Sequence, residues 1–251
     1  MVSTVERFSD RVENYVKYRP GYPPEMLEFF SGTLGLTGDS IVADIGSGTG
    51  LSSKPFLDSG SVVYGVEPNA LMRNAAESYL QGHDRFRSIS GTSDNTNLPD
   101  RSVDFVIAAQ AFHWFEPEAT RNEFKRILKP GGYVCLIWNE RQVDTNRFLR
   151  EYEQLLLKYA NDYASVRHEN ITGAVLESVF QQKFERETFA NQQRLDLDGL
   201  KGRMLSSSYM PNEGEPKFGP LIEDLSALFA KHAEGGKITI LYDTNVFYSQ
   251  F

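Results

Sequence analysis

Cysteine is almost absent from the sequence, since Cys135 is the only one among 251 residues. A single thiol cannot form an internal disulfide, and it leaves no cysteine cluster that binds zinc. The four histidines are scattered and never stand four positions apart, the spacing that places two metal ligands on one helix face. The sequence therefore predicts neither a disulfide framework nor a metal site.

Long hydrophobic runs are missing as well. The longest strongly apolar stretches, Phe105–Ala109 and Tyr133–Trp138, fall far short of the roughly 18 to 20 residues that span a bilayer. The first seven residues, MVSTVER, lack the apolar core of a signal peptide. We therefore expect a soluble, cytoplasmic protein without a membrane partner.

The sequence also has no excess of positive charge. Its 26 basic and 34 acidic residues give a net charge of −8, whereas binding to nucleic acid phosphates requires a basic face. No nucleic acid partner is expected, and the oligomeric state is left open. With 40% apolar and 24% charged residues, the chain can bury a core.

Short apolar runs alternate with helical patterns, which is typical of a parallel sheet covered by helices. The predicted strands are Ser40–Ile45, Val62–Val66, Arg85–Ser90, Val103–Ala109, Tyr133–Trp138, Phe184–Phe189 and Lys237–Tyr248. The predicted helices are Phe8–Tyr18, Glu25–Phe30, Leu51–Ser59, Asn69–Gln81, Pro117–Leu128, Thr145–Ala160, Leu197–Ser207 and Leu221–His232. The last strand is expected at the sheet edge, next to the Phe184–Phe189 strand.

One glycine-rich segment, Asp44–Gly50, leaves a predicted buried strand and enters a helix, as nucleotide-type sites in open α/β sheets require. A phosphate-binding loop would need a lysine directly after Gly50, and none is there. A dinucleotide fingerprint would need a third glycine where Leu51 stands. The carboxylate of Asp44 disfavours a pyrophosphate and suits a ligand that carries ammonium and sulfonium charge.

Asp44–Gly50 resembles the first motif of class I S-adenosylmethionine-dependent methyltransferases, and further segments match that family in the expected order. They are Gly65–Asn69, Gly91–Asp94, Leu98–Trp114 and Leu128–Gly132. The N-terminal pattern from Tyr15 to Pro23 (Tyr-x-x-Tyr-Arg-Pro-x-Tyr-Pro) resembles the trans-aconitate methyltransferase-like or methyltransferase type 11 group.

This resemblance implies a Rossmann-like class I methyltransferase fold, with a mostly parallel seven-stranded sheet, helices on both faces and an antiparallel last strand. We expect a single domain over residues 1–251. It divides into an N-terminal helical cap (1–37), a cofactor-binding core (38–140), and acceptor-side insertions with the closing strands (141–251). The implied cofactor is S-adenosyl-L-methionine, which leaves as S-adenosyl-L-homocysteine.

The resemblance also implies which residues contact the cofactor. They are Tyr18, Arg19, Asp44, Gly46, Ser47, Gly48, Gly50, Glu67, Pro68, Met72, Ser93, Asp94 and Gln110. In the family, the counterpart of Glu67 binds the ribose hydroxyls, that of Asp94 faces the adenine amino group, and that of Arg19 can meet the methionine carboxylate. Other roles stay open, because Asp94 can also begin a turn and Arg19 can pair with an acidic side chain.

The expected partner is a small-molecule acceptor, with a carboxylate or hydroxyl oxygen favoured. His113 is a candidate catalytic base, or else a part of the pocket wall. The acceptor candidates are Tyr22, Trp114, Trp138, Asn139, Ser208 and Tyr209. Two other functions stay open, namely a nicotinamide-dependent oxidoreductase and a non-catalytic binding protein on the same fold.

Overall fold

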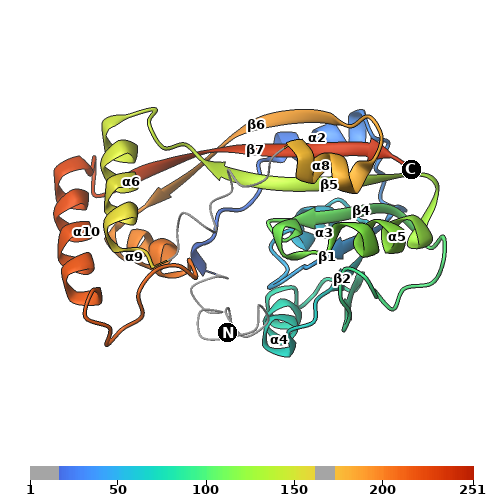
Figure 1. Cartoon of the computed structure of the whole chain (residues 1–251), viewed down its shortest axis with the longest axis horizontal. Helices are drawn as coiled ribbons and strands as arrows, with labels where there is room; N and C mark the ends of the chain where they lie inside the picture. The colour runs from blue at the N-terminus through green and yellow to red at the C-terminus, as the bar shows by residue number, and fades with distance from the viewer. Residues whose placement is uncertain (1–16, 162–172) are drawn as a thin grey trace.

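The computed structural model describes residues 17–161 and 173–251 (Figure 1). Seven strands form one sheet in the order β3-β2-β1-β4-β5-β7-β6. They are β1 Ile41–Ile45, β2 Val62–Val66, β3 Phe86–Ile89, β4 Val103–Ala109, β5 Leu128–Arg141, β6 Glu185–Leu195 and β7 Ile238–Gln250. Strands β1 to β5 pair in parallel, and β7 pairs antiparallel with both β5 and β6. The Rossmann-like fold with an antiparallel last strand is thereby confirmed.

The helices of the described residues connect these strands. They are α2 Pro24–Gly32, α3 Ser53–Asp58, α4 Ala70–Tyr79, the short 3-10 helix η2 Phe112–Trp114, α5 Pro117–Ile127, α6 Arg147–Tyr159, α8 Gly173–Phe180, α9 Leu197–Leu205 and α10 Phe218–His232. Helix α8 has no counterpart among the predictions. Most of the predicted helix Phe8–Tyr18, including Tyr15, lies outside the described residues.

The last strand pairs with the strand that contains Phe189, as expected, but its expected place at the sheet edge is wrong. Strand β7 lies between β5 and β6, and β6 forms the edge of the sheet. The buried side chains of Ile238, Ile240 and Tyr242 fit an interior strand, whereas β6 carries mainly polar residues that tolerate an edge. Pairing with β7 also extends β5 to Arg141, beyond the predicted end at Trp138. The sequence does not predict this extension, because hydrogen bonds to a neighbouring strand leave no periodic pattern of apolar residues.

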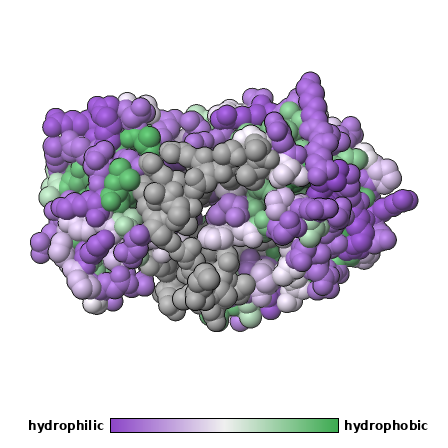
Figure 2. All heavy atoms as spheres, in the orientation of Figure 1, coloured by the Kyte–Doolittle hydropathy of each residue, from purple (hydrophilic) through white to green (hydrophobic). Residues whose placement is uncertain are grey.

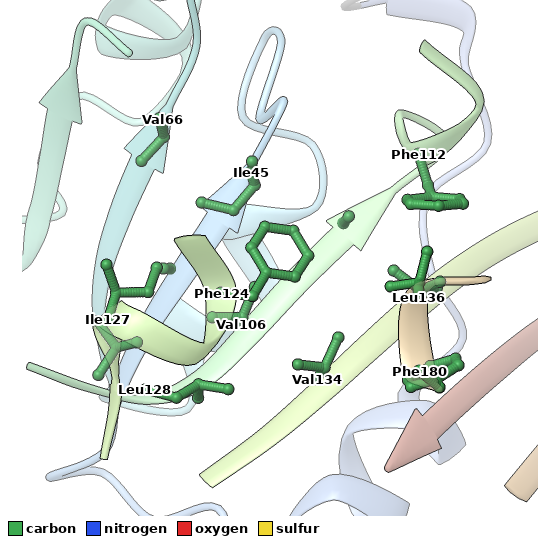
Figure 3. Close-up of a cluster of buried hydrophobic side chains, with 14 of the residues drawn as sticks. Ile45, Val66, Val106, Phe112, Phe124, Ile127, Leu128, Val134, Leu136 and Phe180 are labelled. Atoms are coloured by element: carbon green, nitrogen blue, oxygen red, sulfur yellow. The ribbon is translucent and has the colours of Figure 1, made fainter. Parts of the chain in front are cut away.

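Each face of the sheet buries an apolar cluster. On one face, Val106 and Leu136 of the sheet pack with Phe124 of α5 and Phe180 of α8 (Figure 3). On the other face, α2 and α3 cover the strands through side chains such as Phe30 and Phe56. Complete burial of one such aromatic side chain stabilises the fold by about 2–3 kcal/mol.

A third apolar cluster lies at one end of the sheet. There α6, α9 and α10 pack around the adjoining end of β7, which contributes Ile238, Ile240 and Tyr242. Figure 1 shows these helices well apart from α3, α4 and α5, joined to them by the long strands β5 and β7. We call this part the distal lobe. It faces the carboxyl ends of β1 and β4 across the middle of the molecule.

The outer surface is mostly polar. Figure 2 shows a largely hydrophilic face with only small hydrophobic groups. Among the described residues, the exposed large hydrophobic side chains are Leu71 and Leu157. No helix within these ranges is long and apolar enough to cross a membrane, and no group of three or more potential metal ligands occurs there.

Candidate functional site

The glycine loop, residues 46–50, connects β1 to α3 and adopts backbone conformations that favour glycine. Gly46 has a φ of +71°, and a Cβ atom there would lie 2.6 Å from the Cβ atom of Ala111. Gly48 has a φ of +55°, but a Cβ atom there would meet nothing within 4 Å. Gly46 therefore allows close packing inside the protein, while Gly48 presents its backbone to open space. Gly50 lies against Leu80.

The side chain of Glu67 holds this loop from the end of β2. One carboxylate oxygen, Oε2, accepts a hydrogen bond from the backbone N–H of Gly48 at 3.1 Å. The other, Oε1, accepts one from the backbone N–H of Asn69 at 2.8 Å. Burial raises the pKa of Glu67 above its ordinary value, while these two hydrogen bonds favour the charged form and oppose the shift. The carboxylate therefore stands at the junction of the glycine loop and β2.

Asp44 lies beneath the glycine loop and is fully buried. Its Oδ2 atom accepts hydrogen bonds from the hydroxyls of Ser52 and Ser53, each at 2.7 Å. Its Oδ1 atom has no hydrogen-bond partner among the described residues. Burial raises the pKa of Asp44 from 3.8 to about 6, against the effect of the two serines. Sequence reasoning missed Ser52 and Ser53, although their place at the start of the predicted helix was a usable signal.

A strained residue directly follows β4. Gln110 has a φ of +58°, a left-handed conformation that costs a non-glycine residue roughly 1–2 kcal/mol. Its backbone N–H donates to the carbonyl of Ile137 at 3.0 Å, and its Nε2 donates to the carbonyl of Asn139 at 3.2 Å. Such strain is concentrated at functional sites, where the surrounding structure holds a side chain in place.

The glycine loop and Gln110 border a small cleft that is partly open to solvent. It opens at the carboxyl ends of β1 and β4, where the strand order reverses and ligands bind in open α/β sheets. The lining residues are Arg19, Pro20, Tyr22, Gly46, Ser47, Gly48, Leu51, Ser52, Ala109, Gln110, Asn139 and Arg203. The cleft therefore brings together seven of the predicted site residues, and Arg203 joins them without having been predicted.

The segment of residues 18–23, which we call the connector, is fastened across this cleft. Asn139 Nδ2 and Asn191 Nδ2 both donate to the carbonyl of Gly21, at 3.0 and 2.9 Å. The Nη2 atom of Arg19 donates to the carbonyl of Ser206 at 2.9 Å. The ring of Tyr18 fits against Gly202 of α9, so closely that a Cβ atom there would lie 2.1 Å from it. Side chains from β5 and β6 and the end of α9 therefore hold the connector in place.

His113 belongs to η2, with its ring centroid 4.3 Å from that of Trp114 and 5.5 Å from that of Trp138. His113 is exposed to solvent beside these two rings. The pKa of His113 falls to about 4, first because desolvation disfavours the charged ring and then because Arg19 is nearby. The imidazole is therefore neutral at physiological pH. Trp138 is buried in the main core, while Trp114 is partly exposed.

The remaining predicted cofactor residues follow β2 and β3 along the same side of the sheet. Pro68 is exposed and Met72 is buried in α4. Ser93 accepts a hydrogen bond from the hydroxyl of Thr120 at 2.9 Å. Asp94 is exposed in a turn closed by two backbone hydrogen bonds between Thr92 and Asn95. Asp94 therefore lies inside this turn rather than at its start, and its side chain is exposed.

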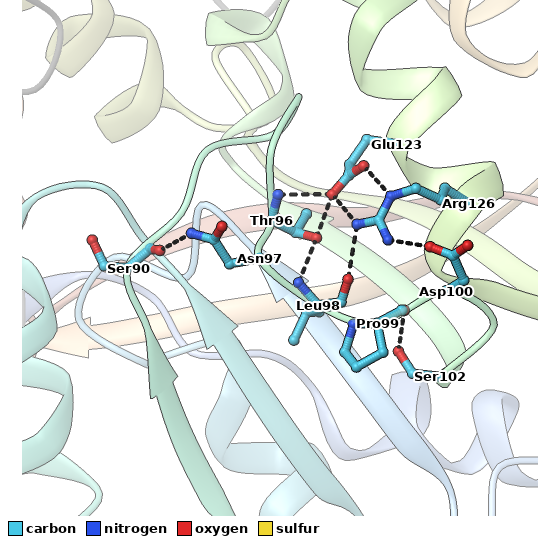
Figure 4. Close-up of polar contacts among 9 residues, drawn as sticks. All are labelled: Ser90, Thr96, Asn97, Leu98, Pro99, Asp100, Ser102, Glu123 and Arg126. Carbon is cyan, nitrogen blue, oxygen red and sulfur yellow. Dashed lines mark hydrogen bonds and ion pairs between the residues drawn. The ribbon is translucent and has the colours of Figure 1, made fainter.

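An ionic network supports the loop that follows Asp94 (Figure 4). The carboxylate of Glu123 accepts hydrogen bonds from the backbone and the hydroxyl of Thr96, at 2.8 and 2.5 Å. Arg126 donates to Glu123, to Asp100 and to the carbonyl of Leu98. These contacts lower the pKa of Glu123 from 4.5 to about 2 despite its burial. The network fixes the chain between β3 and β4.

Two predicted acceptor residues, Ser208 and Tyr209, lie outside the lining of the cleft. Both follow α9 and are partly buried, and Tyr209 packs with the apolar cluster of the distal lobe. The carbonyl of Tyr209 accepts a hydrogen bond from the N–H of Asn161 at 2.9 Å. Tyr22 and Asn139 are the acceptor candidates that line the cleft.

Comparison with known sequences shows that the part of the chain around this site is similar to methyltransferases. Residues 43–136 match the family model described as a methyltransferase domain. An uncharacterised methyltransferase of Mycobacterium tuberculosis is 34% identical over 134 residues, which cover 53% of this chain and 52% of that protein. An uncharacterised methyltransferase-like protein of Schizosaccharomyces pombe is 29% identical over 168 residues, covering 64% and 62%. The chain spans about half the length of the first curated relatives it matches.

Solved structures give the same fold. A structure described as a type II methyltransferase from Anaeromyxobacter dehalogenans superposes with a TM-score of 0.68 at 19% identity, covering 93% of this chain and 98% of that one. A methyltransferase assigned to antibiotic biosynthesis in Anabaena variabilis superposes with a TM-score of 0.60 at 22% identity, covering 94% and 99%. At these identities the similarity establishes the fold alone.

Proposed function

We propose that the chain is a class I S-adenosylmethionine-dependent methyltransferase and that it transfers the methyl group of that cofactor to a carboxylate oxygen of a small molecule. One observation carries the proposal. The glycine loop, held by Glu67, and the strained Gln110 meet at a single cleft at the carboxyl ends of β1 and β4. This is the place where open α/β sheets bind nucleotide-like ligands.

The residues present fit S-adenosylmethionine. The open space at Gly48 leaves room for a ligand against the loop backbone. The unpaired Oδ1 atom of Asp44 is a buried acceptor that suits an N–H donor or a cationic group, directly or through water. When bound, the cofactor supplies a methyl group that its sulfonium centre has already activated.

Under this proposal, each part of the cofactor has a protein partner. Glu67 accepts hydrogen bonds from the ribose hydroxyls, and Arg19 binds the methionine carboxylate. Met72 and Asp94 flank the adenine, with Ser93 and Pro68 beside them. Gln110, whose side chain is fixed on the carbonyl of Asn139, positions the methionine part. Alignment of the two reactants in this way lowers the activation barrier for methyl transfer by several kcal/mol.

The properties of His113 favour a carboxylate as acceptor. A hydroxyl acceptor must lose a proton during transfer, and a general base works best with a pKa near the operating pH. With a pKa of about 4, His113 is a weak base. A carboxylate is already deprotonated near neutral pH and needs no base. We therefore assign His113, with Trp114, to the wall of the acceptor pocket.

A labelling experiment tests this function. The protein is incubated with methyl-labelled S-adenosylmethionine and a series of small carboxylic acids and phenols, and each product is then treated with alkali. Methyl esters release volatile labelled methanol, whereas methyl ethers of phenols do not. The proposal predicts volatile label from at least one acid, and a rate that changes less than threefold in His113→Asn. Label found only in alkali-stable products would contradict the carboxylate assignment, and no transfer at all would contradict the activity.

A further inference from the structure

The cleft holds a positive charge that no methyltransferase motif explains. Arg203 lies in the last turn of α9 and reaches the cleft from the distal lobe. The glycine loop borders the same cleft from the main sheet. A ligand in the cleft therefore meets the glycine loop from one part of the molecule and a guanidinium from another.

The partners of Arg203 are all neutral. Its Nε donates to the hydroxyl of Tyr242 at 3.1 Å, and its Nη1 donates to the hydroxyl of Ser207 at 3.3 Å. Its guanidinium also lies over the ring of Tyr242, 5.9 Å from the centroid. Both N–H groups of Nη2 are without a protein acceptor in residues 17–161 and 173–251. By contrast, Arg126 and Arg141 each form ion pairs with carboxylates.

Arg203 is held in a fixed position rather than free in solvent. Its acceptor Tyr242 is almost completely buried and donates its own hydroxyl hydrogen to Gln193 Oε1 at 2.8 Å. Gln193 in turn donates from Nε2 to the carbonyl of Tyr18 in the connector at 3.1 Å. A chain of hydrogen bonds therefore runs from the guanidinium to the segment that crosses the cleft.

Positive charge accumulates around this position. Arg19 binds the carbonyl of Ser206, and Arg203 binds the side chain of the next residue, Ser207. The end of α9 offers Arg203 a partial negative charge of only about half an electron. A guanidinium stays charged at any accessible pH, and the partial burial of Arg203 without a counter-charge carries a desolvation cost. An anion in the cleft offsets that cost.

From these contacts we propose that Arg203 binds a carboxylate of the methyl acceptor and so selects acceptors that carry an anionic group besides the oxygen to be methylated. The planar fork of an arginine matches a carboxylate with two parallel hydrogen bonds. Arg19 binds the carboxylate of the cofactor, and Arg203 binds that of the acceptor. Because the chain has a net charge of −8, this local positive site also distinguishes the cleft from the rest of the surface. The inference rests on the proposed function, since it needs an acceptor beside the cofactor.

Calorimetric titration of the protein saturated with S-adenosylhomocysteine tests this inference. The probes are acetate, succinate, glutarate and benzoate, with neutral succinamide and inorganic phosphate as comparisons. We expect at least one carboxylate to bind the wild type and succinamide not to bind. Arg203→Gln should weaken that binding at least about tenfold, as expected for a lost charge-assisted pair. Arg194→Gln, which removes an exposed positive charge on β6, should leave it unchanged.

Several results would overturn the inference. They are binding of none of the four carboxylates, equal binding by Arg203→Gln, and tighter binding of phosphate than of any carboxylate. If Arg203→Gln loses as much affinity for S-adenosylhomocysteine as for the carboxylate, the residue belongs to the cofactor site instead. If Arg203→Gln fails to fold, Arg203→Lys carries the test, because it keeps the charge but loses the fork. Failure of the wild type to bind S-adenosylhomocysteine would contradict the proposed function itself, before any acceptor is added.

Discussion

The carboxylate of Glu67 accepts a hydrogen bond from the backbone N–H of Gly48 at 3.1 Å, so the end of β2 and the glycine loop form one unit. Glu67 is partly buried, and Gly48 faces open space. A ligand that lies over the loop therefore meets the backbone of Gly48 and a carboxylate already oriented by it. This pair is the centre of the proposed cofactor site.

Alanine substitutions at two glycines should separate folding from ligand binding. Gly46→Ala places a Cβ atom 2.6 Å from that of Ala111, so we expect a loss of at least about 2 kcal/mol in the free energy of unfolding. Gly48→Ala meets no atom within 4 Å and should cost only about 1 kcal/mol from its positive φ. Its effect should fall on cofactor binding instead. Urea unfolding of both variants measures the loss of stability, and titration with S-adenosylhomocysteine measures the loss of affinity. A larger loss of stability in Gly48→Ala together with a larger loss of affinity in Gly46→Ala would contradict this prediction.

The buried carboxyl of Asp44 should make stability fall as the pH rises from about 4 to about 6. Its pKa is raised from 3.8 to about 6, so the folded state binds more protons than the unfolded state in this range. The corresponding cost at neutral pH is about 3 kcal/mol at most. Asp44→Asn removes this titration while its amide oxygen still accepts from Ser52 or Ser53. Urea midpoints at pH 4 and pH 7 should differ less in this variant than in the wild type. An unchanged difference between the two midpoints would show that Asp44 does not titrate as described.

Glu123 should behave in the opposite way. The pKa of Glu123 is lowered to about 2 by Arg126 and Thr96. The charged carboxylate therefore stabilises the folded state above about pH 4.5, and this stabilisation is lost as the pH falls towards 2. Glu123→Gln should destabilise the protein by about 2 kcal/mol at pH 7 and much less at pH 3. Thermal unfolding at both pH values measures this, with the exposed Glu77→Gln on α4 as the control. A pH-independent effect would mean that packing, rather than charge, explains the loss.

The role of Arg19 is tested by two ligands that differ in one part. S-adenosylhomocysteine has the methionine-derived carboxylate, and methylthioadenosine lacks it. Arg19→Ala should weaken binding of the first by about tenfold and leave the second nearly unchanged, because only the first has a partner for the guanidinium. Equal losses for both ligands would assign the effect to the connector, which Arg19 fastens to Ser206.

Sequence reasoning succeeded where a local pattern sets the structure. Strands β2 and β4 have the predicted bounds, because each is a short apolar run that ends at a turn. The glycine loop was found from the residue types that its left-handed backbone requires. The contact between Gly48 and Glu67 follows from parallel strands whose carboxyl ends share one edge of the sheet.

The features that the sequence did not predict depend on tertiary contacts. Helix α8 is stabilised by packing of Phe180 and its neighbours on the core beside α5, and no motif marks it. The interior position of β7 follows from pairing with β6 on one side and β5 on the other. Arg203 was missed because it belongs to no motif, and only the fold of the distal lobe brings it to the glycine loop.

Calorimetric titration with S-adenosylhomocysteine, with NADH as the comparison ligand, tests the central claim most directly. The account predicts micromolar binding of S-adenosylhomocysteine, a loss of at least about tenfold in Glu67→Gln, and no binding of NADH. Leu51 lines the cleft where a dinucleotide-binding loop has a glycine, which is the reason to expect no NADH binding. Folded protein that binds NADH instead, or binds neither ligand, would contradict the account and return the alternatives of an oxidoreductase or a non-catalytic binding protein.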